Sequence, residues 1–127
     1  MKLQILIVLA LAGCTETVTQ APPQNDTVTI SLIRYEGMRG GVNARVNVFN
    51  DTDRYLDFLA CDLTAYSGHF GIVATAYGYG VTSNLVAGGD IDADIVLSPT
   101  PAAPITHTNY SCTARTSDET KRIIGGF

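Results

Sequence analysis

The strongest constraint on the fold is a series of short segments in which apolar and polar residues alternate, beginning at Val28. The segment from Val42 to Val48 is the clearest, with valine or alanine at every second position and asparagine or arginine between them. A period of two puts every second side chain on the same face of a β-strand, so each segment predicts a strand with one buried face. No stretch has a convincing helical pattern. The chain beyond its N-terminal region is therefore expected to be all-β.

Six or seven short strands are expected. The clearest cover residues 28–32, 42–48, 56–66, 72–77, 91–97 and 105–115. Turn-forming residues separate them, namely Asn50 to Asp53, Gly78 and Gly80, Gly88 and Gly89, and Pro99, Pro101 and Pro104. Glycine and short polar side chains favour turns, and proline cannot donate a hydrogen bond within a sheet. This pattern favours a small β-sandwich, with a small barrel as the alternative.

The N-terminus has the layout of an export signal. A short basic start precedes an almost uninterrupted apolar run over residues 3–11, which is long enough for a signal peptide but shorter than the roughly 20 residues of a membrane span. Leu11-Ala12-Gly13-Cys14 resembles the lipobox of bacterial lipoproteins. The resemblance implies that residues 1–13 are a signal peptide and that Cys14 becomes the lipidated first residue. The alternatives are an ordinary signal peptide with an incidental Cys14, or a buried apolar strand.

Residues 14–27 are expected to be the lipidated cysteine and a flexible tether, since they lack apolar periodicity and include Pro22 and Pro23. Some thirteen residues reach at most about 45 Å when fully extended. No later segment approaches the length of a membrane-spanning helix, so any membrane attachment would come from the lipid. Thr15 stands where an aspartate retains many lipoproteins in the inner membrane. The resemblance therefore implies the outer membrane, on its periplasmic side.

The balance of charge excludes one class of partner. The chain has 8 Lys and Arg residues against 12 Asp and Glu residues, for a net charge of −4. No basic cluster is available to neutralise phosphates, which is the term that dominates binding to nucleic acids. Nucleic acid is therefore not an expected partner.

Setting Cys14 apart leaves Cys61 and Cys112 as an even pair. In an exported protein such a pair predicts a disulfide, and both residues lie on the expected inward faces of their strands, so a bridge through the core is reasonable. It would close a loop of about 52 residues, worth around 4 kcal/mol in the chain-entropy model. Two free thiols or a redox pair are the alternative, although neither cysteine has a neighbouring histidine or lysine in sequence to lower its pKa.

Three motifs resemble the FxLYD-type, immunoglobulin-like domains of extracytoplasmic bacterial proteins. They are the run from Arg45 to Phe58, the segment from Cys61 to Tyr66, and the segment from Asn84 to Gly89. The resemblance covers about residues 28–115 and implies an immunoglobulin-like sandwich that serves as a scaffold rather than an enzyme. The chain departs from the pattern at Ser67, where aspartate commonly follows the tyrosine, and in a longer turn up to Gly71.

The domain is expected to cover residues 28–116, with a C-terminal tail at 117–127. That tail carries a charged group followed by Ile123, Ile124, two glycines and Phe127. The sequence leaves three alternatives for this segment: a frayed end, a last strand docked on the sandwich, or a short partner-binding peptide.

Two groups of side chains are candidate binding sites. Asp90, Asp92 and Asp94 alternate along one strand and would form a carboxylate row about 7 Å apart, but the glycine and bidentate glutamate of a calcium loop do not follow them. A solvated acidic face that keeps the strand from pairing with other chains is the favoured interpretation. Tyr77 and Tyr79 lie among glycines and suit an adaptable contact loop, with packing in the core as the alternative.

No reaction centre is evident. His69 and His107 have no partner at ligand spacing, so no metal or other cofactor is expected. Ser67 lies near His69 without the glycine-flanked elbow of a serine hydrolase. The favoured hypothesis is a non-enzymatic envelope lipoprotein that contacts another envelope protein or itself. The alternative is an envelope protein that binds a small ligand or metal through the acidic strand or the tyrosine loop.

Overall fold

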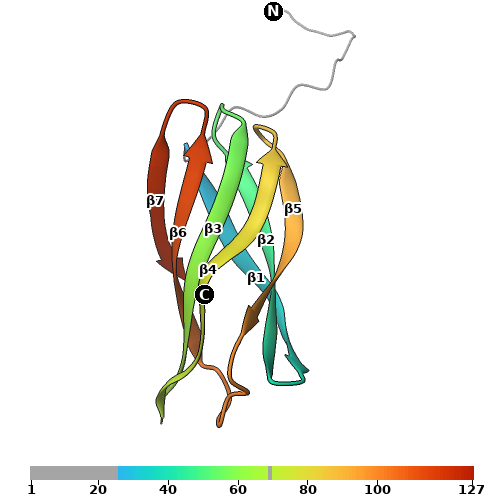
Figure 1. Cartoon of the computed structure of the whole chain (residues 1–127), viewed down its shortest axis with the longest axis vertical. Helices are drawn as coiled ribbons and strands as arrows, with labels where there is room; N and C mark the ends of the chain where they lie inside the picture. The colour runs from blue at the N-terminus through green and yellow to red at the C-terminus, as the bar shows by residue number, and fades with distance from the viewer. Residues whose placement is uncertain (1–25, 69) are drawn as a thin grey trace, which may run out of the picture.

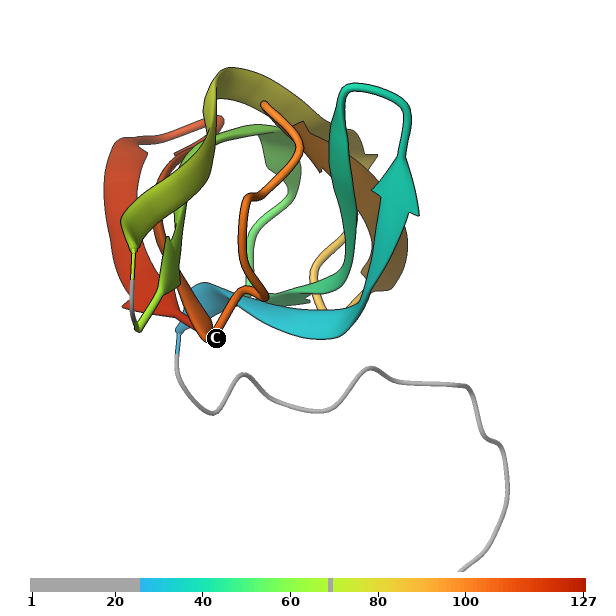
Figure 2. The same cartoon turned by 90° about the horizontal axis from the view of Figure 1, so that it is seen from below.

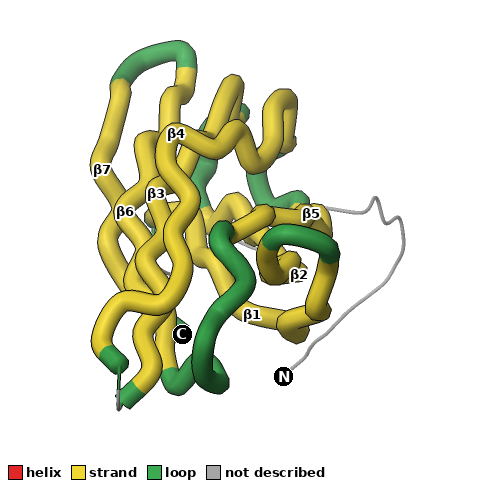
Figure 3. Tube along the Cα trace, turned by 60° about the horizontal axis from the view of Figure 1, so that its bottom comes forward, coloured by secondary structure: helices red, strands yellow, loops and turns green. Residues whose placement is uncertain are grey.

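The computed structural model describes residues 26–68 and 70–127. The predicted signal peptide, the lipid site at Cys14, nearly all of the predicted tether and His69 lie outside the described residues. Within them the chain forms seven β-strands and no helix, as the tube in Figure 3 shows. The strands are β1 (Thr27–Met38), β2 (Gly41–Asp51), β3 (Leu56–Ser67), β4 (Gly71–Leu85), β5 (Asp90–Leu97), β6 (His107–Thr116) and β7 (Thr120–Gly126).

The strands form two antiparallel sheets that face each other across one core (Figure 1 and Figure 2). The three-stranded sheet has the order β1-β2-β5 and the four-stranded sheet the order β4-β3-β6-β7. This confirms the predicted all-β sandwich. In the lettering used for immunoglobulin domains, β1, β2 and β5 correspond to strands A, B and E, and β3, β6 and β7 correspond to strands C, F and G. β4 pairs with β3 at the edge of the second sheet. In the part of the chain that the structure describes, no helix is long and apolar enough to cross a membrane.

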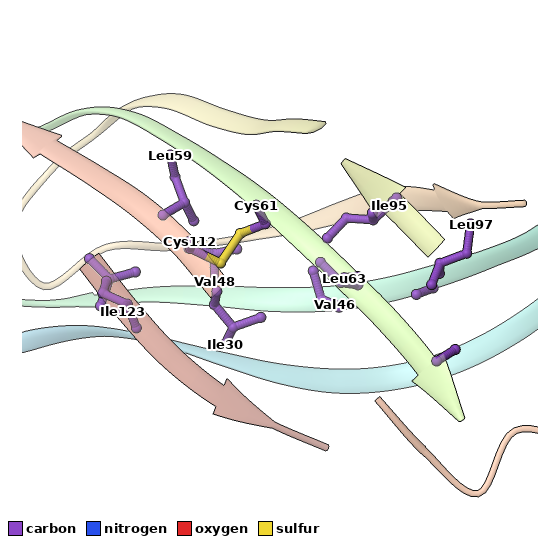
Figure 4. Packing of buried hydrophobic residues seen from close by; sticks show 14 of the residues in the cluster. Ile30, Val46, Val48, Leu59, Cys61, Leu63, Ile95, Leu97, Cys112 and Ile123 are labelled. Carbon is purple, nitrogen blue, oxygen red and sulfur yellow. A yellow bond between two sulfur atoms is a disulfide. The ribbon is translucent and has the colours of Figure 1, made fainter. Parts of the chain in front are cut away.

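Alternating side chains fill the space between the sheets, as the sequence predicts. On β2, Ala44, Val46 and Val48 are fully buried. On β3, the predicted inward face is buried from Leu59 to Ala65 at every second residue. Val46 and Leu63 belong to the same buried cluster as Ile95 and Leu97 from β5, as Figure 4 shows. Burial of each large apolar side chain contributes about 1.5–3 kcal/mol, so this alternation supplies the main stabilising term.

The predicted disulfide is confirmed and lies within one sheet. Cys61 on β3 stands directly opposite Cys112 on β6, with an S–S distance of 2.04 Å and a Cα–Cα distance of 4.0 Å. Both cysteines are almost completely buried on the core face of the sheet (Figure 4). The bridge therefore joins neighbouring strands, whereas the disulfide of antibody domains joins the two sheets.

A buried asparagine holds the predicted turn after β2. The Asn50 side chain is fully buried, and its amide nitrogen lies 2.8 Å from the Arg54 carbonyl oxygen and 3.0 Å from that of Leu85. Its Oδ1 atom accepts a hydrogen bond of 2.7 Å from the Thr52 hydroxyl. One side chain thus ties the β2–β3 turn to the connection after β4. The backbone of Asn50 adds two further bonds to that connection, one to Gly88 and one to Gly89.

The prediction that Gly78 and Gly80 end the fourth strand is wrong. β4 continues through both glycines to Leu85, and its register against β3 shifts at three places. At one of these bulges Gly78 has a φ of 61°, and its N–H donates to the Asp62 carboxylate at 2.6 Å. Glycine adopts such a φ at little cost, so it allows the strand to bulge and continue instead of ending.

The assignment of residues 117–127 to a tail outside the domain is also wrong. β7 pairs with β6 along its length, and Ile123 lies opposite Cys112 on the core side with 9% of its surface exposed. Gly125 lies beneath the Tyr110 ring, where an added Cβ atom would come within 2.4 Å of the phenol oxygen. The last segment is therefore the docked strand among the three alternatives, and the folded domain extends to Phe127.

The proline-containing connection from β5 to β6 carries the chain from one sheet to the other (Figure 2), as the sequence predicts. At its start, Ser98 exchanges two backbone hydrogen bonds with Thr75 on β4, of 2.9 and 3.0 Å. This bridge joins the edges of the two sheets at one point. Near the same end, the Tyr35 hydroxyl on β1 hydrogen-bonds the hydroxyl of the fully buried Thr108 on β6.

Candidate functional site

The two ends of the sandwich differ in what they carry. β1 begins at the end where the β2–β3, β4–β5 and β6–β7 turns lie, shown at the top of Figure 1. The β1–β2 and β3–β4 hairpins and the β5–β6 connection lie at the opposite end. Anything attached before Asp26 therefore enters at the first end, and the β3–β4 hairpin projects away from it.

The most exposed large apolar side chains all belong to the four-stranded sheet or its hairpin. Phe70, Ile72, Tyr77 and Ile124 have 64%, 60%, 72% and 75% of their surface exposed. Every other exposed large apolar residue among those described lies between 43% and 49%. We call the solvent side of β4, β3, β6 and β7, together with Phe70 at the hairpin, the outer face of the four-stranded sheet. Such concentration of exposed apolar surface is a common property of protein contact sites.

Polar groups occupy the middle of this face. A hollow of about 450 Å³ lies between β3, β6 and β7, and Asp62, Asn109, Ser111 and Ile124 are part of its lining. Arg122 donates a hydrogen bond of 3.0 Å to the Ser111 hydroxyl at its margin. The combination of apolar side chains with a small number of polar groups is typical of the surfaces that proteins use to recognise one another.

Two arginines of the outer face have no acidic partner. Arg115 lies over the Phe58 ring at 5.4 Å, and Arg122 contacts only the serine named above among polar side chains. Neither forms an ion pair with any residue between 26 and 68 or between 70 and 127. Their charges therefore remain available to a carboxylate outside the domain.

The predicted acidic row lies on the solvent side of the three-stranded sheet and is already satisfied. Asn43 and Arg45 each donate to Asp94 at 2.9 Å. Asn47 donates to both Asp90 and Asp92, at 2.8 and 3.0 Å. These donors come from β2, which pairs with β5 in the register that places the two rows side by side. Hydrogen bonds from Asn43 and then from Arg45 lower the pKa of Asp94 below its ordinary value of 3.8.

Tyr77 and Tyr79 do not form one surface. Tyr77 points to solvent on the outer face, whereas Tyr79 lies opposite Cys61 and packs against the core. The bulge at Gly78 separates the two orientations, so the contact interpretation fits Tyr77 and the packing interpretation fits Tyr79. The segment is also part of a strand, which replaces the predicted adaptable loop.

Of the remaining polar residues named from the sequence, the structure describes His107 and Ser67. His107 stacks on Tyr66 with ring centroids 4.9 Å apart, and its Nε2 atom lies 3.1 Å from the Asn109 Oδ1 atom. Ser67 is buried in the strand end before the hairpin. Among the residues that the structure describes, no group of three or more histidine, cysteine or acidic residues is arranged to hold a metal ion.

One contact was not anticipated from the sequence. Tyr35 lies beyond the predicted end of the first strand, and its hydroxyl crosses the core to Thr108. Burial raises the pKa of Tyr35 above 10.0, and the hydrogen bond to Thr108 opposes this in part. The available signal was the continuing alternation through Leu32 and, after a one-residue bulge, Tyr35, which the predicted strand left out.

Comparisons with known proteins add no relatives to this picture. Neither the scan against protein-family models nor the search of curated proteins finds a match. The resemblances to the lipobox and to FxLYD-type domains therefore stay predictions from short motifs.

Proposed function

We propose that this protein is a lipid-anchored envelope lipoprotein that acts as a non-enzymatic contact module for another envelope protein. The observation that carries the proposal is the difference between the two outer faces. The acidic row on one is satisfied by asparagine and arginine side chains, and the other presents Tyr77, Ile124 and two arginines without acidic partners. The partner surface is the outer face of the four-stranded sheet.

The anchor in this proposal is Cys14, on the strength of Leu11-Ala12-Gly13-Cys14 after an apolar run. Two or three acyl chains at about 0.8 kcal/mol per buried methylene would hold the domain to a membrane without a spanning helix. The proposed address is the outer membrane on its periplasmic side, because Thr15 follows the cysteine. The disulfide fits an oxidising compartment of this kind.

Mass spectrometry of the protein from membranes tests the anchor. The expected mature N-terminus is Cys14 carrying a diacylglyceryl thioether, and Cys14→Ser is expected to abolish lipidation and release the protein from the membrane fraction. Recovery of an unmodified Cys14, or of a chain cleaved elsewhere, contradicts the proposed anchor.

Site-specific photocrosslinking in intact cells tests the contact surface. A photoreactive side chain at Tyr77 is expected to give a discrete crosslinked product, and one at Asn47, on the opposite outer face, is expected to give none. Identification of the product by mass spectrometry names the partner. Equal crosslinking from the two positions, or none from Tyr77, contradicts the assignment of the surface.

The alternative function, metal binding by the acidic strand, has less support. Each of the three carboxylates already accepts a hydrogen bond from β2, and a calcium ion would need six to eight oxygen ligands from a wrapped loop. Thermal unfolding with and without Ca²⁺ or Zn²⁺ separates the two functions. A rise in melting temperature that is lost in Asp92→Asn would favour the alternative.

A further inference from the structure

Among the edge strands that the structure describes, β7 is distinguished by an unshifted pairing with its neighbour and by positive charges that are confined to its first half. The register of β4 against β3 shifts three times, and that of β1 against β2 shifts once, at Ile33. The β5 edge carries the acidic row and is bridged to β4 through Ser98. Bulges, charges and covering contacts of this kind prevent edge-to-edge association. β7 pairs with β6 without any shift and lies at the margin of its sheet (Figure 1 and Figure 3).

The backbone polar groups that point away from the sheet can be assigned along β7. Phe127 and Thr108 exchange both of their backbone hydrogen bonds, so the N–H and C=O groups of Phe127 point toward β6. The direction alternates along an antiparallel strand. The N–H and C=O groups of Gly126, Ile124 and Arg122 therefore point to the open edge.

The side chains of β7 are divided between its two halves. The first half carries the cations Lys121 and Arg122, the second half carries Gly125 and Gly126, and Ile124 lies between them with 75% of its surface exposed. Two copies of this strand in antiparallel orientation would place each charged half beside a glycine half. Repulsion between the cations is then avoided, and the aliphatic stem of each arginine covers bare glycine backbone.

We propose that the occupant of this edge is a second copy of the chain, paired antiparallel with Ile124 opposite Ile124 of the second copy. Arg122 then faces Gly126 of the second copy, and about six backbone hydrogen bonds join the two strands. The two four-stranded sheets become one continuous sheet. This inference rests on the proposed function as a contact module and adds a second contact to it, the open edge of β7, which binds another copy of the chain.

Other registers that satisfy the same backbone groups are less favourable. A shift that places Arg122 opposite Arg122 of the second copy brings like charges into direct contact, which destabilises a sheet. A shift centred on Ile123 puts the two arginines on neighbouring diagonal positions, about 7–8 Å apart. In the proposed register they are four positions apart along the strand, or about 13 Å. Charge separation therefore selects the pairing through Ile124.

Cysteine crosslinking of the full-length protein in membranes tests the pairing and its register. Residues directly opposite in a hydrogen-bonded pair have Cα atoms about 5.5 Å apart, which is within the range of a disulfide. Under mild oxidation Ile124→Cys is expected to give a covalent dimer on a non-reducing gel. Thr120→Cys is the matched control on the same strand and face, and it leaves Arg122 in place. It is expected to give at least tenfold less dimer, because Thr120 has no copy of itself opposite in the proposed register. Dimer formation by Thr120→Cys at the level of Ile124→Cys, or by neither variant, overturns the proposal.

A proline substitution provides a second measurement. The N–H of Ile124 points to the open edge, so Ile124→Pro should leave the β6–β7 pairing in place while blocking the approach of another strand. Native mass spectrometry of the detergent-extracted protein is expected to show dimers for the parent protein and for Ile124→Val, and monomers for Ile124→Pro. An intact Cys61–Cys112 disulfide and retained strand circular dichroism verify that the proline variant folds.

The same variants carrying Cys14→Ser separate this inference from the proposed function. Dimerisation through β7 needs no lipid, so the crosslinking pattern is expected to persist at equal protein concentration. A chain that is lipidated and crosslinks from Tyr77 but is monomeric in all these assays overturns the dimer and leaves the contact module standing. If the protein dimerises but carries no lipid at Cys14, the proposed anchor is overturned and the β7 pairing stands.

Discussion

Substitution of Asn50 gives the sharpest test of how the two layers are joined at the end where β1 begins. In Asn50→Ala the Leu85 and Arg54 carbonyl oxygens lose a buried donor at 3.0 and 2.8 Å, and the Thr52 hydroxyl loses its acceptor at 2.7 Å. A buried polar group left without its partner costs about 1–3 kcal/mol. With these oxygens and the hydroxyl only partly reached by water, the expected loss is about 3 kcal/mol. For a domain of this size that lowers the melting temperature by roughly 12–24 °C.

Two matched variants test the role of the Asn50 side chain. Asn47→Ala removes an asparagine that also makes two side-chain hydrogen bonds, to Asp90 and Asp92, but on an exposed face, so the expected loss is below about 1 kcal/mol. Asn50→Asp should be worse than Asn50→Ala, because a carboxylate oxygen would face the Leu85 carbonyl oxygen. Urea unfolding monitored by circular dichroism measures all three free energies. Equal losses for Asn50→Ala and Asn47→Ala would refute the role assigned to Asn50.

Three further results are expected. Replacing both Cys61 and Cys112 with alanine should lower the free energy of unfolding by about 4 kcal/mol in urea titrations, because the bridge closes a loop across 51 positions; an effect below about 1 kcal/mol would contradict this. The lowered pKa of Asp94 contributes stability at pH values above its ordinary value of 3.8, and this stability is lost as the pH falls through the lower pKa of the folded state. In Asp94→Asn the melting temperature should therefore depend less on pH below about 4. The raised pKa of Tyr35 contributes stability below pH 10.0 that declines as the pH rises above it. Tyr35→Phe should therefore be less stable near neutral pH yet lose less stability above pH 10.0, and an unchanged alkaline slope would count against this.

Residues that alternate strictly were predicted well from the sequence. The inward faces of β2 and β3 and the pairing of Cys61 with Cys112 follow from a period of two and an even cysteine count. The hydrogen bonds to the three aspartates could not be predicted from the sequence. Asn43, Arg45 and Asn47 reach them only because of the register between β2 and β5. Register between strands that are distant in sequence depends on the whole core.

Bulges account for the two errors in strand length on β1 and β4. A bulge inserts one residue and reverses the alternation beyond it, as at Ile33 and again at Gly78. Alternation that fails in this way looks like the end of a strand when only the sequence is known. β7 was left undecided for a different reason, since its two glycines lower strand propensity although the Tyr110 ring requires the one at Gly125.

The direction in which β1 enters the domain has a mechanical consequence. Force transmitted through residues before Asp26 pulls along β1, whose pairs with β2 run from Thr27 opposite Asp51 to Met38 opposite Gly41. A load applied at the opposite end of the sandwich then shears these pairs together instead of opening them one at a time. The Cys61–Cys112 bridge lies in the other sheet and carries none of this load directly. Resistance to pulling is therefore set by the β1–β2 hydrogen bonds, and reduction of the disulfide should leave the first rupture force nearly unchanged.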